Sequence, residues 1–215
     1  MHKRDRIGVG GLADIQSLDR KRQRGNRVTY APAVITSRVT TRSWAATTAL
    51  IVGVATLTAL AAQWRIPLWP VPITGQTFAV LLGGAALGWR AGGAAQLLYL
   101  AVGALGAPVF TEVSGGIAVL TGTTAGYLIG FPVAAALVGW LAERHHDRRF
   151  WTMVAAFGAG SAVIYLFGMA GLVALGFSPG SALANGVVPF LVGDALKAAA
   201  AGILLPGAWR LLERA

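Results

Sequence analysis

Two residues of opposite charge, Asp194 and Lys197, lie three positions apart in the otherwise apolar stretch 185–209. They are the only charged residues between Phe150 and Trp209. An ionised side chain near the middle of a membrane helix costs about 2.5–3.5 kcal/mol, and such residues commonly serve a function. The i, i+3 spacing places both on one helix face, where a carboxylate can accept N–H donors and an ammonium can meet a carboxylate. The pair therefore indicates either the polar floor of a ligand cavity or an internal ion pair that only holds helices together.

Neutral polar residues that could line the same cavity occur in two other segments. Thr74 and Gln76 follow a run of prolines, which cannot be the interior of a regular helix. The block GTTAGYLIGF places Gly122, Thr124 and Tyr127 close together. A single threonine or tyrosine more often packs than binds a ligand, but their occurrence alongside two intramembrane charges favours a cavity.

The residues that catalysis or metal binding would require do not occur in a usable pattern. Lys197 is the only lysine beyond residue 42 and alanine follows it, so the ATPase motif G-x-x-x-x-G-K-[ST] is absent from the sequence. Histidine occurs only at His2, His145 and His146, outside the long apolar runs, and there is no cysteine. We therefore expect no catalytic residues, no metal site and no cofactor, and we interpret the chain as something other than an enzyme.

The elements that must position these residues are apolar helices. Hydrophobic residues make up 55% of the 215-residue chain and charged residues 12%, whereas soluble domains carry roughly 25% charged residues. Several uncharged runs approach or exceed the roughly 20 residues that cross a bilayer. We predict an all-α integral membrane protein in which residues 43–215 form a six-helix transmembrane domain. The predicted helices cover residues 44–63, 76–88, 91–107, 117–142, 150–176 and 188–212.

Two further patterns concern the connections between these helices and their packing. Residues 178–186, SPGSALANG, are expected to form an uncharged loop. Glycines recur at four-residue spacing at positions 84, 88 and 92 and again at 122, 126 and 130. In a membrane this spacing lets helix backbones approach closely, so we interpret these glycines as packing positions.

The uneven distribution of charge predicts the orientation of the chain. Residues 1–42 hold ten of the eighteen Lys and Arg residues, and we interpret them as a basic, disordered cytoplasmic tail that orients the first helix, with contact to anionic lipid as the alternative. With this tail inside, most other basic residues also fall inside, and Arg65 and Glu112 fall outside. Both termini are therefore predicted to be cytoplasmic. The basic charge is not interpreted as a nucleic-acid site.

Three blocks of sequence, within residues 44–212, resemble the BioY family, the biotin-specific substrate-binding (S) components of energy-coupling factor (ECF) transporters. The blocks are PVPITGQTF, GTTAGYLIGFP and PFLVGDALKA, in the order and spacing typical of the family. The resemblance implies an S-component fold of six transmembrane helices in a prokaryotic-type plasma membrane, which captures biotin at the outer face. Uptake would be driven by a separate transmembrane coupling (T) subunit and two ATPase subunits.

The resemblance also implies roles for individual residues. The biotin pocket would include Thr74, Gln76, Gly122, Thr124, Tyr127, Asp194 and Lys197. Asp194 would accept hydrogen bonds from the ureido N–H groups, and Lys197 would balance its charge or meet the valerate carboxylate, although these roles could be exchanged. Ala45 and Ala49 would form an A-x-x-x-A element that docks the T subunit.

The chain departs from the family at two points near the expected pocket. The segment TEVSGG stands where the family is typically glycine-rich, and it places Glu112 near the pocket mouth, where it could alter gating or simply be solvated. Thr123 stands where a proline is usual. Two other functions remain open: an S component for another small vitamin, and a membrane scaffold whose Asp194–Lys197 pair is structural.

Overall fold

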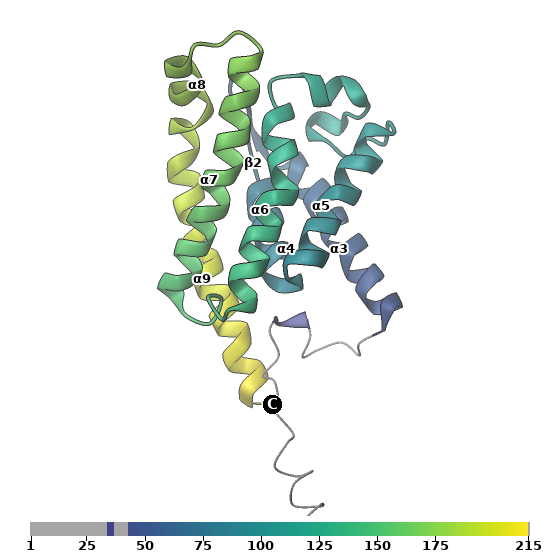
Figure 1. Cartoon of the computed structure of the whole chain (residues 1–215), viewed down its shortest axis with the longest axis vertical. Coiled ribbons are helices and arrows are strands. Elements are labelled where there is room, and N and C mark those ends of the chain that lie inside the picture. The colour runs from purple at the N-terminus through teal and green to yellow at the C-terminus, as the bar shows by residue number, and fades with distance from the viewer. Residues whose placement is uncertain (1–33, 37–42, 215) are drawn as a thin grey trace, which may run out of the picture. The chain divides into compact units, whose positions relative to one another are not determined.

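Seven α-helices account for most of the residues that the structure describes (Figure 1). The computed structural model describes residues 34–36 and 43–214, all within the unit formed by residues 32–215. The helices are α3 (Trp44–Gln63), α4 (Gln76–Leu87), α5 (Trp89–Ala104), α6 (Ala125–Glu143), α7 (Phe150–Ala174), α8 (Pro179–Gly186) and α9 (Leu191–Arg214). The predicted tail, residues 1–42, lies outside the described residues apart from 34–36, so its boundary stays a prediction.

The helix predicted to start at residue 117 instead starts at Ala125. Residues Ile117–Thr121 form a 3-10 helix, η2, and a second 3-10 turn, η1 (Thr111–Val113), precedes it. The hydroxyl of Thr123 donates a hydrogen bond of 2.7 Å to the carbonyl of Pro70, in the connection between α3 and α4. This long-range contact holds the chain in an irregular path over the bundle until α6 begins.

Residues 178–186, predicted to be a loop, contain the short helix α8. Its first residue is Pro179, and proline is well tolerated there because the first N–H groups of a helix have no intrahelical partner. The hydroxyl of Ser178 caps the helix by accepting a hydrogen bond of 3.2 Å from the Ser181 N–H. The Ser-Pro pair is therefore a helix start signal here and not a loop signal. A third 3-10 turn, η3 (Val188–Phe190), joins α8 to α9.

Four elements of the described part of the chain are long and apolar enough to cross a membrane. They are Trp44–Gln63, Ala125–Glu143, Phe150–Ala174 and the stretch Pro179–Arg214. Helices α4 and α5 have 12 and 16 residues, or about 18 and 24 Å at 1.5 Å per residue, which is short of the roughly 30 Å hydrocarbon core. A mostly helical membrane fold is confirmed, whereas the count of six crossing helices stays a prediction.

Helix α6 occupies the centre of the bundle and packs against α4, α5 and α7 (Figure 1). Two of the predicted packing glycines make these contacts possible. A Cβ atom on Gly84 would collide with the backbone of Ala135 in α6, and one on Gly126 would collide with the backbone of Phe167 in α7. The prediction of close helix approach is thus confirmed at these two positions.

The segment between α3 and α4 is a small hairpin and not a helix, as its prolines indicated. Strands β1 (Arg65–Ile66) and β2 (Ile73–Thr74) pair antiparallel, with Arg65 opposite Thr74. The hairpin ends directly at α4, so Thr74 lies beside Gln76 at the start of that helix.

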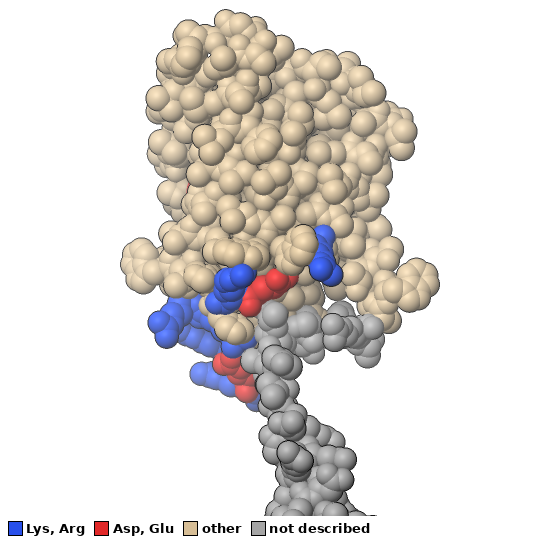
Figure 2. Space-filling view, in the orientation of Figure 1, with Lys and Arg blue, Asp and Glu red and all other residues tan. Residues whose placement is uncertain are grey.

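Charged side chains visible in Figure 2 gather at one end of the described residues, the end at which α9 terminates. The connection between α6 and α7, which contains Arg144, Arg148 and Arg149, lies at this end (Figure 1). The opposite end of the same face is uncharged in this view. This asymmetry is the pattern that the positive-inside rule describes.

Candidate functional site

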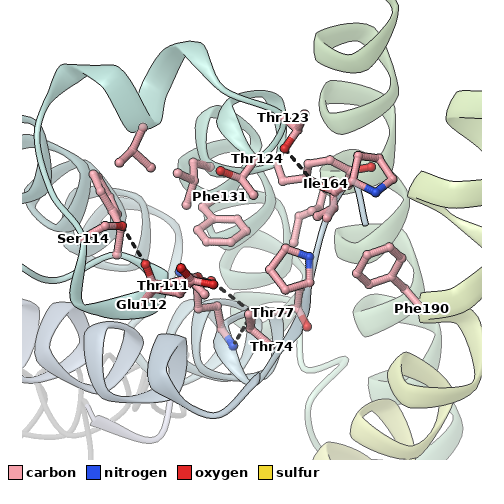
Figure 3. Close-up of a pocket in the computed structure, with 18 of the residues that line it drawn as sticks. Thr74, Thr77, Thr111, Glu112, Ser114, Thr123, Thr124, Phe131, Ile164 and Phe190 are labelled. Carbon is pink, nitrogen blue, oxygen red and sulfur yellow. Dashed lines mark hydrogen bonds between the residues drawn. The ribbon is translucent and has the colours of Figure 1, made fainter. Parts of the chain in front are cut away.

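A cavity of about 220 Å³ lies among the hairpin segment, the 3-10 turns and helices α4, α6, α7 and α9 (Figure 3). Its size is slightly below the roughly 300–1,000 Å³ of most ligand pockets, which suits a small ligand. Figure 3 shows Thr74, Thr77 and Thr111 grouped below the ring of Phe131 in this view. The polar lining residues are Thr74, Gln76, Thr77, Thr111, Glu112, Ser114, Thr123, Thr124, Tyr127, Tyr165 and Lys197, and the large apolar ones are Phe110, Leu128, Phe131, Ile164 and Phe190.

Lys197 contributes the ammonium group at one side of this cavity. Its Nζ atom donates to the carbonyl oxygen of Thr74 at 2.9 Å, to Oγ1 of Thr77 at 2.7 Å and to Oδ1 of Asp194 at 2.9 Å. An ammonium has three N–H donors, so all of them are engaged. The amine is thus held in a fixed position between α4 and α9, with 19% of its side chain exposed.

Asp194 lies behind Lys197, and it is not among the residues that line the cavity. Besides the bond from Lys197, its Oδ1 accepts from the hydroxyl of Thr77 at 3.3 Å, and its Oδ2 accepts from the hydroxyl of Tyr165 at 2.6 Å. Only 8% of the residue is exposed. The two charges therefore compensate each other, and α4, α7 and α9 are joined through them.

Gln76 is a second polar centre and is 4% exposed. Its Nε2 donates to the hydroxyl of Tyr99 at 2.7 Å, and its Oε1 accepts from the hydroxyls of Thr74 at 3.0 Å and Thr111 at 3.4 Å. The Tyr99 hydroxyl in turn donates to the carbonyl of Val109 at 3.2 Å. This network fixes which way the amide points and ties α4 to α5 and to the segment that follows it.

The three residues predicted from the block GTTAGYLIGF take different positions. Thr124 and Tyr127 line the cavity, but the Tyr127 hydroxyl donates to the carbonyl of Gly186 in α8 at 2.8 Å, so its ring provides an apolar wall while its polar end is already bonded. Gly122 lies instead in a separate shallow groove between α6 and α7, with Ala125 and Gly126. Five of the seven predicted pocket residues therefore line one cavity, with Asp194 directly behind it.

Sequence reasoning missed several residues of this site. Thr77 bonds both charged residues, and Tyr165 bonds Asp194. Both could have been suspected from the sequence. Thr77 directly follows Gln76, and Tyr165 is the single tyrosine of the long apolar helix α7, where a hydroxyl needs a hydrogen-bond partner. Phe190 had no signal, because aromatic residues are common in membrane helices.

An ion pair lies at the edge of the cavity. Arg65 Nη1 is 2.7 Å from Glu112 Oε1, with 35% and 63% of the two side chains exposed. Glu112 lines the cavity and has a left-handed backbone, with φ at 64°. Gln63 bonds the same turn twice, donating to the carbonyl of Phe110 at 3.0 Å and accepting from the N–H of Val113 at 3.1 Å. The turn that carries Glu112 is thus fastened to the end of α3 and to the hairpin.

The predicted docking residues, Ala45 and Ala49, are both exposed near the start of α3. Their role in docking a T subunit stays a prediction. Within residues 34–36 and 43–214, no three His, Asp or Glu side chains lie close enough together to hold a metal ion.

Comparison with known proteins identifies relatives along most of the chain. A protein of Pyrococcus horikoshii named as a probable biotin transporter BioY is 42% identical over 149 residues, which is 69% of this chain and 86% of that protein. The biotin transporter BioY of Thermotoga maritima is 37% identical over 153 residues, covering 71% of this chain and 89% of that protein.

The fold has a counterpart among solved structures. The crystal structure of an S-component for biotin from an ECF-type ABC transporter superposes with a TM-score of 0.72 at 21% identity, over 80% of this chain and 94% of that one. The model of the BioY family matches residues 31–214. With this match, two relatives above one-third identity and a shared fold, the chain belongs to the BioY family.

Proposed function

We propose that this protein is the biotin-binding membrane subunit, the S component, of an ECF-type vitamin uptake transporter. The observation that carries the proposal is the cavity itself. In this member of the BioY family, aromatic side chains form much of the cavity wall. The ammonium of Lys197 and hydrogen-bonded hydroxyl and amide groups line another side. Biotin combines an apolar ring sulfur and alkyl chain with a ureido group and a carboxylate, which is the same mixture of chemistry.

In this arrangement Lys197 is the member of the charged pair that faces the ligand cavity, and Asp194 holds it in place from outside the cavity. Asp194 would reach a ureido N–H directly only if the side chains around it moved, because it is 8% exposed and does not line the cavity. The remaining polar contacts to the ligand would come from Thr74, Gln76 and Thr124. The protein supplies binding and orientation, and we propose no cofactor and no catalytic step.

We further propose that α4 and α5 cross the membrane as short helices, which gives six crossings with α3, α6, α7 and α9. Both termini would then face the cytoplasm, in agreement with the arginines gathered at the end where α9 terminates. The membrane is the plasma membrane, and biotin enters the cavity from the outer side.

Active uptake requires other chains under this proposal. A transmembrane coupling subunit would dock on α3, where Ala45 and Ala49 leave small, exposed side chains that allow close helix contact. Two ATPase subunits would supply the energy, because the sequence has no nucleotide-binding motif of its own.

Direct binding to the purified full chain tests the proposal. Isothermal titration in lipid nanodiscs should give saturable, one-site binding of biotin, and weaker or no binding of thiamine and riboflavin. Binding of another vitamin in place of biotin would make the chain an S component for that vitamin. No binding of any of them would favour a scaffold in which the Asp194–Lys197 pair is structural.

A further inference from the structure

The ammonium of Lys197 is poorly placed to receive the carboxylate of a ligand. Its three donors are used by Thr74, Thr77 and Asp194, and its charge is balanced by a carboxylate 2.9 Å away. A second carboxylate could bind Lys197 only by breaking one of these bonds, and it would bring an uncompensated negative charge beside buried Asp194. The carboxylate of biotin therefore needs another cation.

Arg65 is the cation with unused capacity at this cavity. A guanidinium has five N–H donors in a planar fork that suits a carboxylate, and within the described residues its one polar side-chain contact is the 2.7 Å ion pair with Glu112. Arg65 does not itself line the cavity, but its partner Glu112 does (Figure 3), so the guanidinium lies just outside the cavity, 2.7 Å from a lining side chain. Arg65 also lies opposite Thr74 in the hairpin, which connects its position to the polar side of the same cavity.

We infer that Arg65 is the residue that receives the carboxylate of biotin, and that Glu112 occupies it in the empty protein as an internal substitute for the ligand. This inference rests on the proposed function. The two carboxylates compete for one guanidinium, and the 63% exposure of Glu112 lets it return to water at little cost. The exchange keeps the charge balanced, since one carboxylate replaces another beside Arg65 while the Asp194–Lys197 pair stays intact.

Under this inference the two ends of biotin bind at different parts of the cavity. The carboxylate meets Arg65 at the edge, and the ureido group goes to the interior, where Thr74, Gln76 and Lys197 are held. Glu112 then affects selectivity between anionic and neutral ligands. It repels an anionic ligand until Arg65 binds that ligand's carboxylate, but it does not repel a neutral ligand.

The test compares biotin with biotin methyl ester, which lacks the charge. Affinities of the full chain in nanodiscs are measured by titration for wild type, Arg65→Gln, Glu112→Gln and the double variant. Arg65→Gln should weaken biotin binding about tenfold and leave the ester unchanged, as expected for losing one charge-assisted contact. Glu112→Gln should strengthen biotin binding about threefold, as expected for removing a weak exposed competitor. This gain should vanish in the double variant because Glu112 acts through Arg65.

Matched controls are Arg214→Gln and Glu213→Gln, which make the same charge changes at exposed positions near the end of α9. Both should leave the biotin-to-ester ratio at the wild-type value. An unchanged ratio in Arg65→Gln, or an equal loss for biotin and ester, would overturn the assignment of Arg65. If wild type bound neither compound, the proposed function itself would fail, so the two failures are distinguishable.

Discussion

Replacing Lys197 with methionine removes a charge but keeps an unbranched apolar chain, so it isolates the effect of the Asp194–Lys197 pair on stability. Asp194 would remain 8% exposed, with hydrogen bonds from Thr77 and Tyr165 but without its cation. Removing one partner of a buried ion pair costs about 3–5 kcal/mol, because the other charge is left uncompensated. The two remaining hydrogen bonds place the expected cost at the lower end, about 3 kcal/mol.

The second substitution, Asp194→Asn, should recover most of this loss. The asparagine amide oxygen can still accept from the Tyr165 hydroxyl, and no charge is left without a partner. The double variant Lys197→Met with Asp194→Asn should therefore cost about 1 kcal/mol, less than Lys197→Met alone. A double variant that is more stable than one of its single variants is the signature of charge compensation and not of packing.

Thermal unfolding in detergent, followed by size-exclusion fluorescence, measures the effect. At about 2–4 °C per kcal/mol for a chain of this size, Lys197→Met should lower the apparent Tm by about 6–12 °C, and the double variant by about 2–4 °C. Leu196→Met, at an exposed neighbouring position, is the control for introducing methionine and should leave the Tm unchanged. Equal Tm losses in the single and double variants would refute the reasoning.

Two further predictions concern the close packing of α6 against α7 and the buried carboxyl of Asp147. Gly126→Leu should lower the apparent Tm in the same assay by more than about 10 °C, because a Cβ there meets the backbone of Phe167, whereas Gly158→Leu has no neighbour within 4 Å and should be neutral. Asp147 is fully buried in the connection between α6 and α7, and burial raises the pKa of its carboxyl. The raised pKa of Asp147 in the folded state means that its protonated form is favoured, so stability falls as pH rises from the unfolded pKa to the folded pKa. Asp147→Asn, which can still accept from Trp209 Nε1, should raise the Tm at about pH 7, and the gain should vanish near about pH 3, below the ordinary carboxyl range; a gain of equal size at both values would contradict this.

Local signals explain why most helix ends could be predicted. Helix α3 starts one residue after Ser43, whose hydroxyl accepts from the Ala46 N–H at 3.1 Å, and a charge-free apolar run follows. The prolines before Thr74 excluded a helix there, and a hairpin is found.

The two wrong predictions, a helix over 117–124 and a loop over 178–186, have different physical origins. A contact from Thr123 to Pro70 keeps the first segment out of α6, and no local pattern reports a partner 53 residues away. In the second segment, the cap at Ser178 is a local signal for a helix start, although the Ser, Pro and Gly residues around it are also typical of a loop.

The sequence also placed the main polar residues, because a charge in an apolar membrane helix is costly and is kept where it has a role. It could not say which of them face the cavity. The sequence predicts both Asp194 and Lys197 as pocket residues, but in the structure only Lys197 lines the cavity, while Asp194 lies outside it and accepts hydrogen bonds from Tyr165 and Thr77. Gly122 belongs to the same block as Thr124 and Tyr127, but it lies in the groove between α6 and α7 and not in the cavity.

By itself, then, the sequence determined the membrane class, the helix ends governed by caps and prolines, and the identity of the charged pair, since each depends on composition or on neighbours a few residues apart. Only the tertiary structure decided that Thr77 and Tyr165 complete the pair and that Arg65 meets Glu112 at the cavity edge. The bonds from Tyr165 to Asp194 and from Lys197 to Thr77 join residues 29 and 120 positions apart. The packing of the helices against one another brings such residues together, and no sequence window contains that information.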